Sequence, residues 1–249
     1  QEGTQTGLYL SMGFALAAAV LHAIFGALQK GRHDPWLSRA AIDTVIFVLA
    51  TPVALTLVPW PAPHLWLIFA GAWVIHTVYK ILQAMTYTRG AYTVVYPVVR
   101  GTGPLFAVLG AGLIFGEHFN GWQWFGVAVL LSGIYGLALY NLRKLTVGRD
   151  RLVPALGFAV ATGAMVALYT TYDAYGIRAT ENPFTFLAWF FVLDSLFMPV
   201  VGARRLVALP RAELVALLKR GFVGAIVAFA SFGGIMLAMV ESVDHVTET

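Results

Sequence analysis

The sequence contains no cysteine and few charged residues. Of its 249 residues, 11% are Asp, Glu, Lys or Arg and 59% are hydrophobic, whereas soluble globular domains carry about 25% charged residues. The lack of cysteine excludes disulfides, iron–sulfur clusters, zinc–thiolate sites and cysteine nucleophiles. With a mean hydropathy of +0.77, the chain has too little polar surface for a water-soluble domain. We therefore expect lipid to be its solvent.

Eight long apolar segments follow one another along the chain. A spanning helix needs about 20 apolar residues, because the hydrocarbon layer is about 30 Å thick and a helix rises about 1.5 Å per residue. The segments lack the alternation typical of the strands of a membrane barrel. The sequence predicts an all-α, polytopic helical membrane protein with eight spans, at residues 7–29, 37–58, 64–86, 91–115, 122–140, 152–175, 183–201 and 222–240.

The basic residues gather in alternate loops between these segments. The odd-numbered loops contain 13 of the 16 Lys and Arg residues, and the even-numbered loops contain one, Arg178. Because basic loops stay on the cytoplasmic side, the odd-numbered loops are predicted to be cytoplasmic and both chain ends external. This bias accounts for the net charge of +4, so a nucleic-acid partner is not expected.

Short sequence matches recur at an offset of about 150 residues. Residues 12–17 (MGFALA) match 156–161 (LGFAVA), and 81–85 (ILQAM) match 235–239 (IMLAM). The offset makes the first five helices the repeat unit, and an odd number of spans inverts the second copy. We interpret residues 1–146 as the first repeat and 147–249 as an incomplete second repeat, because its last two helices, the ninth and tenth of the protein, would begin near residue 246.

The fourth and fifth predicted helices carry recognisable motifs. Residues 91–97 (AYTVVYP) lead into 103–106 (GPLF), Gly116-Glu117 closes the helix, and 122–126 (WQWFG) and 132–134 (SGI) follow. With these residues the chain resembles the drug/metabolite transporter superfamily, in its ten-helix EamA-like branch. The resemblance implies transport of a small polar or amphipathic metabolite by alternating access between the inverted repeats. It places the chain in the inner (plasma) membrane of a bacterium.

Arg100 is the strongest indication of a functional site within the predicted spans. It lies ten residues into the segment 91–115, where a charge costs at least about 2.5–3.5 kcal/mol to insert. Two prolines and two glycines at 97–104 predict a break in this helix. Tyr92, Tyr96 and Arg100 recur every four residues and share one face. We interpret them as a clamp for an anion or carboxylate, whose orientation the tyrosine hydroxyls set.

The alternative is that Arg100 pairs with Asp43, Asp173 or Asp194 and only holds helices together. Asp194, central in its span, must be paired or protonated, whereas Asp173 is either a binding group or an interfacial cap. The third span carries a polar stripe of His76, Lys80, Gln83 and Tyr87.

Within that stripe, Lys80 is expected to snorkel to the interface. His76 is either a proton relay or a buried structural histidine. The candidate substrate-binding residues are Arg100, Tyr96, Tyr92, His76, His22, Tyr169 and Asp173.

No motif for catalysis, metal binding or a cofactor emerges from the sequence. A phosphate-binding glycine loop with lysine, an HExxH pair and a nucleophile elbow are all missing. The expected partners are a small-molecule substrate and the lipid bilayer, and a partner membrane protein or a second copy is a further option. The main alternative function is a transporter-derived, non-transporting membrane subunit packed against a partner. A membrane enzyme is a third possibility, for which the sequence offers no paired catalytic groups.

Overall fold

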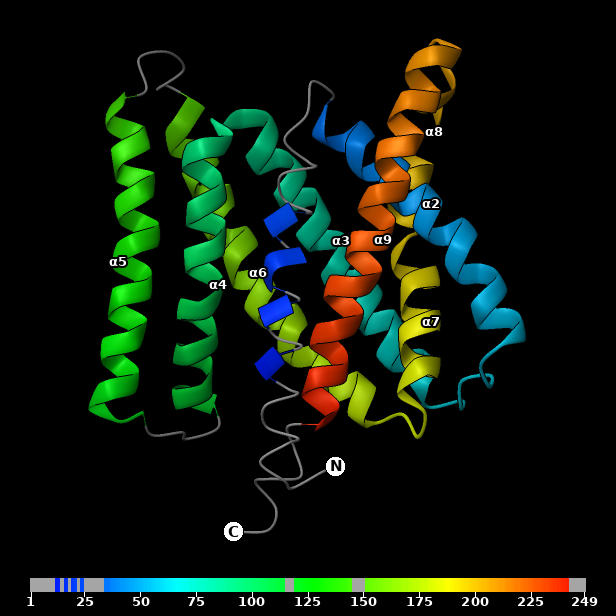
Figure 1. Cartoon of the computed structure of the whole chain (residues 1–249), viewed down its shortest axis with the longest axis horizontal. Helices are drawn as coiled ribbons and strands as arrows, with labels where there is room; N and C mark the ends of the chain where they lie inside the picture. Colours follow the sequence, from blue (N-terminus) through cyan, green and yellow to red (C-terminus); the bar gives the residue numbers. More distant parts are fainter. Residues whose placement is uncertain are drawn as a thin grey trace. The chain divides into compact units, whose positions relative to one another are not determined.

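The computed structural model describes residues 12–13, 16–17, 19–21, 23–24, 34–114, 119–144 and 151–241 (Figure 1). Every regular element within these residues is a helix, which confirms the predicted all-α class there. The long helices are α2 (Pro35–Thr56), α3 (Leu65–Arg89), α4 (Tyr92–Ile114), α5 (Gly121–Lys144), α6 (Leu152–Arg178), α7 (Pro183–Asp194), α8 (Phe197–Val207) and α9 (Arg211–Glu241).

Six of these helices are long and apolar enough to cross a membrane, namely α2, α3, α4, α5, α6 and α9. The pair α7 and α8 adds a seventh span if the two helices, bent by 42° at a short break, are counted as one. These helices coincide with seven of the eight predicted segments. The count of eight stays a prediction, because the first segment, 7–29, lies largely outside the described residues.

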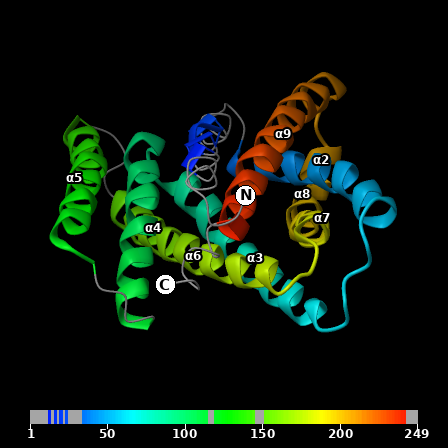
Figure 2. The same cartoon turned by 60° about the horizontal axis from the view of Figure 1, so that its bottom comes forward.

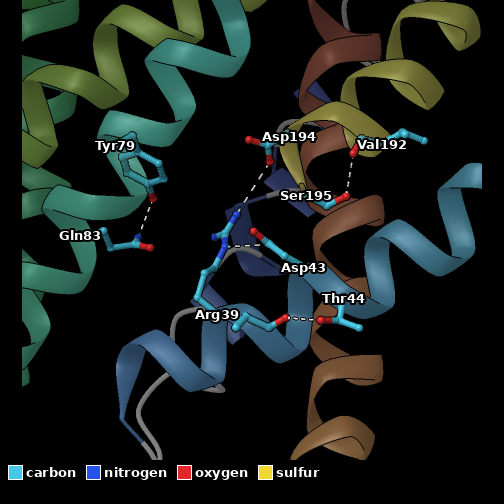
Figure 3. Close-up of polar contacts among 9 residues, drawn as sticks. Arg39, Asp43, Thr44, Tyr79, Gln83, Val192, Asp194 and Ser195 are labelled. Carbon is cyan, nitrogen blue, oxygen red and sulfur yellow. Dashed lines mark hydrogen bonds and ion pairs between the residues drawn. The ribbon is translucent and has the colours of Figure 1, made fainter. Parts of the chain in front are cut away.

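The break predicted in the fourth span is wrong. Helix α4 runs without interruption from Tyr92 to Ile114 and contains both Pro97 and Pro104. Spanning helices tolerate proline where neighbouring groups satisfy the carbonyls that lose a partner. The break lies instead between α7 and α8, inside the predicted continuous span 183–201. There the Ser195 hydroxyl donates to the Val192 carbonyl at 2.9 Å (Figure 3), which offers the backbone an alternative to continuing the helix.

The chain forms two compact units. Unit 1 comprises residues Gln1–Trp73 and Tyr172–Thr249, and unit 2 comprises Val74–Thr171. Helices α3 and α6 therefore contribute to both units. The repeat boundary at 146/147 concerns sequence duplication rather than compactness, and it stays a prediction.

In unit 1, α2 packs against α7, α8 and α9 (Figures 1 and 2). Ile42, Ile46 and Ala50 recur at four-residue intervals, so that one face of α2 enters the core. Gly224 of α9 allows a close approach, because a Cβ there would lie 2.9 Å from the Ile42 side chain. Aromatic rings continue this core, with Phe69 on Phe186 (5.2 Å), Phe186 on Phe190 (5.9 Å) and Phe190 on Phe232 (6.0 Å).

In unit 2, α4 packs along α5 (Figure 1). Its buried valines, Val95, Val98 and Val99, form one apolar cluster with Ala138 of α5 and with Ala155 and Ala159 of α6. Two hydroxyl pairs link helices within this unit. Thr102 and Tyr135 are 2.9 Å apart, and Thr86 and Thr162 are 3.1 Å apart.

Gly163 of α6 lies close to α4. A Cβ at this position would lie 2.5 Å from the Thr102 Cβ and 3.0 Å from the Val99 carbonyl oxygen, whereas a Cβ at Gly133 of α5 would meet nothing within 4 Å. We expect Gly163→Ala to destabilise the protein by about 1–3 kcal/mol through overpacking. Gly133→Ala serves as the control and should be neutral or slightly stabilising. Thermal unfolding in detergent measures the stability of both variants. Equal unfolding midpoints would contradict the close packing of α6 on α4 at Gly163.

Candidate functional site

Arg100 is a partly buried cation on α4 in unit 2. Its guanidinium carbon lies 5.3 Å from the centre of the Tyr96 ring, one helical turn earlier. Its Nε atom is buried and has no hydrogen-bond partner in the part of the chain that the structure describes. A cation–π contact stabilises the charge but does not satisfy an N–H donor. The Nε–H group therefore remains available to an acceptor.

A row of tyrosine rings extends from Arg100 towards α3. Tyr96 stacks on Tyr92 with ring centres 4.9 Å apart and an interplanar angle of 19°. Tyr92 in turn contacts Tyr87 of α3, at 5.0 Å between ring centres. The shared face predicted for Tyr92, Tyr96 and Arg100 is confirmed by these contacts. We call the four residues Tyr87, Tyr92, Tyr96 and Arg100 the Arg100 row.

A second aromatic group gathers around His76, which is buried on α3. The His76 ring lies 4.6 Å from Tyr169 of α6 and 6.4 Å from Tyr79, and Tyr79 and Tyr169 are 5.0 Å apart. The Gln83 amide donates to the Tyr79 hydroxyl at 2.6 Å (Figure 3). His76, Tyr79, Gln83 and Tyr169 therefore form a second polar and aromatic group within unit 2.

Tyr79 is the residue of this region that the sequence analysis missed. It follows His76 by three residues and precedes Gln83 by four, so it shares their helical face. The same spacing that grouped the polar stripe on α3 would have found it.

The described part of unit 2 contains no carboxylate. Residues 74–114, 119–144 and 151–171 hold six basic side chains and neither Asp nor Glu. Among the six, Lys80 is 1% exposed, so the expectation that it snorkels to the interface is wrong. For Arg100, whose side chain is half-buried, the described part of its own unit therefore holds no carboxylate that could neutralise the charge.

The carboxylates of interest lie in unit 1, around Arg39. The Arg39 Nε donates to Asp43 Oδ1 at 2.9 Å, and an Arg39 terminal nitrogen lies 4.0 Å from Asp194 Oδ2 (Figure 3). Asp43 is fully buried, and Asp194 is the last residue of α7. The sequence predicts that Asp194 is paired or protonated, and the structure shows it paired. Two of the three carboxylates considered as partners of Arg100 thus have Arg39 as a partner.

The remaining predicted site residues are Asp173 and His22. Asp173 belongs to unit 1 and is 2% exposed. It lies five residues before the end of α6, so its interpretation as an interfacial cap is wrong. His22 lies outside the described residues. The structure brings together Arg100, Tyr96 and Tyr92 in one row and His76 and Tyr169 in one ring cluster.

The described fold is that of a helical protein with several helices able to cross a membrane. No family model matches the chain, and no solved structure matches it significantly. The chain is 33% identical over 70 residues to the uncharacterized protein y4nH of Sinorhizobium fredii (strain NBRC 101917 / NGR234). The match covers 28% of this chain and 60% of that protein, so that protein is about half as long as this chain.

Proposed function

We propose that the protein is a secondary membrane transporter for a small polar or amphipathic metabolite with an anionic group, working by alternating access between inverted repeats. The observation that carries the proposal is Arg100. A charged side chain in an apolar span is costly, and such side chains mark substrate or ion pathways. Its Nε donor has no protein acceptor among the described residues, and a bound anion would supply one.

The surroundings of Arg100 favour an anion over a cation. Unit 2 offers the guanidinium and several tyrosine hydroxyls, and its described residues contain no carboxylate that could bind a cation. Arginine binds carboxylate and phosphate groups through two parallel hydrogen bonds, which are stronger than hydrogen bonds between neutral groups. The stacked rings of Tyr92 and Tyr96 offer apolar area to the remainder of an amphipathic metabolite.

One further observation supports the transport mechanism. Transporters with inverted repeats commonly use discontinuous helices, and the α7–α8 pair, if counted as one span, is bent by 42° at a short break.

Uptake into proteoliposomes tests the proposed function. We expect the purified protein to take up one or more anionic members of a metabolite panel saturably, at least tenfold above protein-free liposomes. Cationic compounds of matched size should neither be taken up nor compete, because Arg100 repels them. A panel in which no anion enters, or in which cations enter equally well, would contradict the proposal.

One observation favours the alternative of a membrane subunit. In the most apolar stretch of α5, only 6% of the residues are buried, compared with 33–44% in the other candidate spans. Lipid or another protein must therefore cover this helix. A protein that shows no uptake and copurifies stoichiometrically with a membrane partner would support that alternative.

A further inference from the structure

Two buried hydrogen-bond donors on α7 have no partner within the described structure, Thr185 Oγ1 and Trp189 Nε1. Both belong to unit 1, and the two residues are only 3% and 6% exposed. They are four residues apart and therefore share one face of the helix. Buried polar groups are nearly always hydrogen-bonded, so each exception calls for an explanation.

The position of Thr185 explains why its hydroxyl has no intrahelical acceptor. Threonines elsewhere in these helices donate to the carbonyl four residues earlier, as Thr44 does at 2.7 Å and Thr51 at 2.6 Å. Thr185 is the third residue of α7, which begins at Pro183 after the cap Asn182. The residue four positions earlier precedes the helix, so its carbonyl is not aligned to accept. The indole of Trp189 can only donate, so its buried N–H likewise needs an acceptor.

The indole ring of Trp189 lies beside two tryptophans that are open to the surroundings. Trp60, between α2 and α3, lies 4.8 Å from it, and Trp66, near the start of α3, lies 5.4 Å from it. Trp60 is 65% exposed and Trp66 is 39% exposed. The buried Trp189 indole is thus bordered by aromatic surface that a ligand can reach.

The donors do not belong to the large cavity of unit 1. That cavity, of about 630 Å³, is lined on α7 by Phe184, Leu187, Ala188 and Phe191, which occupy another face of the helix. Its lining is apolar except for Asn182, so it gives no reason for two buried donors.

We infer that Thr185 and Trp189 form a binding subsite for a planar aromatic compound that carries an acceptor oxygen, such as a carboxylate or an amide carbonyl. The oxygen accepts from the Thr185 hydroxyl and the Trp189 indole, and the ring of the ligand packs on Trp60 and Trp66. As a substrate site the inference rests on the proposed transport function, and it then names aromatic acids and amides as the substrate class. As a binding site it is tested without transport.

Benzamide, benzoate and benzamidine test the subsite, because they share one shape and differ in their polar atoms. Benzamide and benzoate carry an acceptor oxygen, whereas benzamidine has only nitrogen and a positive charge. We expect the first two, at millimolar concentrations, to raise the unfolding midpoint of the purified protein in detergent and to quench tryptophan fluorescence. Benzamidine should do neither. No response to benzamide and benzoate, or an equal response to benzamidine, would overturn the inference.

Trp189→Phe and Thr185→Val remove one donor each. Thr185→Val keeps the shape of the side chain, whereas Trp189→Phe keeps an aromatic ring of smaller size. Each should weaken binding of both benzamide and benzoate about tenfold, whereas Trp122→Phe, at an 83% exposed position, should leave both unchanged. Arg100→Gln separates the two proposals, because benzamide carries no charge for Arg100 to bind. Benzamide binding that persists while anion uptake is lost supports both proposals. Anion uptake that persists in this variant overturns the role of Arg100 and leaves the subsite standing.

The unliganded Thr185→Val variant shows whether the buried hydroxyl is without a partner. It should leave the unfolding midpoint unchanged or raise it, because no hydrogen bond is lost. Thr180→Val is the matched control, since the buried Thr180 hydroxyl donates to the Gly176 carbonyl at 2.9 Å, and it should lower the midpoint. A decrease in Thr185→Val as large as that in the control would show that the Thr185 hydroxyl has a partner, and would overturn the inference.

Discussion

Replacing Arg100 with glutamine is expected to abolish transport of the anionic substrate while the protein remains folded. Glutamine keeps hydrogen-bonding atoms but loses the charge, the paired N–H donors and the contact with the Tyr96 ring at 5.3 Å. Hydrogen bonds to charged groups contribute about 1.5–3 kcal/mol each, and each 1.4 kcal/mol is a factor of ten in affinity. We expect at least a 100-fold loss of substrate affinity, measured by uptake into proteoliposomes and by direct binding.

Two further variants make this result specific. Arg100→Lys keeps a positive charge but loses the planar guanidinium with its paired N–H donors, so it should retain partial activity. Arg143→Gln removes an exposed charge from the last turn of α5 and should transport as the wild type does. The thermal midpoint of Arg100→Gln should not fall, because no carboxylate of the described part of unit 2 pairs with Arg100. A marked fall, or normal uptake of the anion, would show that Arg100 serves the fold rather than the substrate.

The largest loss of stability is expected from Arg39→Met in unit 1. Removing one partner of a buried ion pair leaves an uncompensated charge and costs about 3–5 kcal/mol. The Arg39 side chain is 13% exposed, and it lies 2.9 Å from the fully buried Asp43 and 4.0 Å from Asp194. We therefore expect Arg39→Met to lower the unfolding midpoint in detergent by many degrees.

The Arg205–Asp34 pair is the matched control for Arg39. Its nitrogen–oxygen distance is shorter, 2.5 Å, but the Arg205 side chain is 55% exposed. Exposed pairs contribute about 0–1 kcal/mol, so Arg205→Gln should hardly change the midpoint. The double variant Arg39→Met with Asp43→Asn should recover part of the loss, since it removes one of the two buried carboxylates left by Arg39→Met. Equal midpoints for Arg39→Met and Arg205→Gln would contradict the importance of burial.

The sequence predicts the long apolar helices well, because a run of about 20 apolar residues can be recognised without knowing the rest of the fold. It places the start of α7 at residue 183, where Pro183 follows the capping Asn182. It misses the first turns of α9, which begins at Arg211 rather than near 222. Residues 211–221 carry several charges, and an apolar window does not detect a helix that extends beyond the hydrocarbon layer.

The contacts of the candidate site also differ in how far the sequence predicts them. Contacts within one helix, such as those of Tyr96 with Tyr92 and Arg100, follow from the helical period and are predictable. The contact of His76 with Tyr169 joins two helices, and its geometry depends on how far one helix slides along the other. Local sequence does not encode this register. The unsatisfied donors of α7 are less predictable still, because lacking a partner is a property of the whole fold.

The break after Asp194 has a consequence for motion within the membrane. Helix α7 has 12 residues and α8 has 11, which correspond to about 18 Å and 17 Å at 1.5 Å per residue. Neither helix alone crosses a hydrocarbon layer of about 30 Å. The ladder of backbone hydrogen bonds departs from the α-helical pattern at Leu196, whose N–H donates to the Leu193 carbonyl three residues earlier at 3.2 Å. One half of this span can therefore change its tilt while the other stays docked on α2, at a lower enthalpic cost than bending a continuous helix.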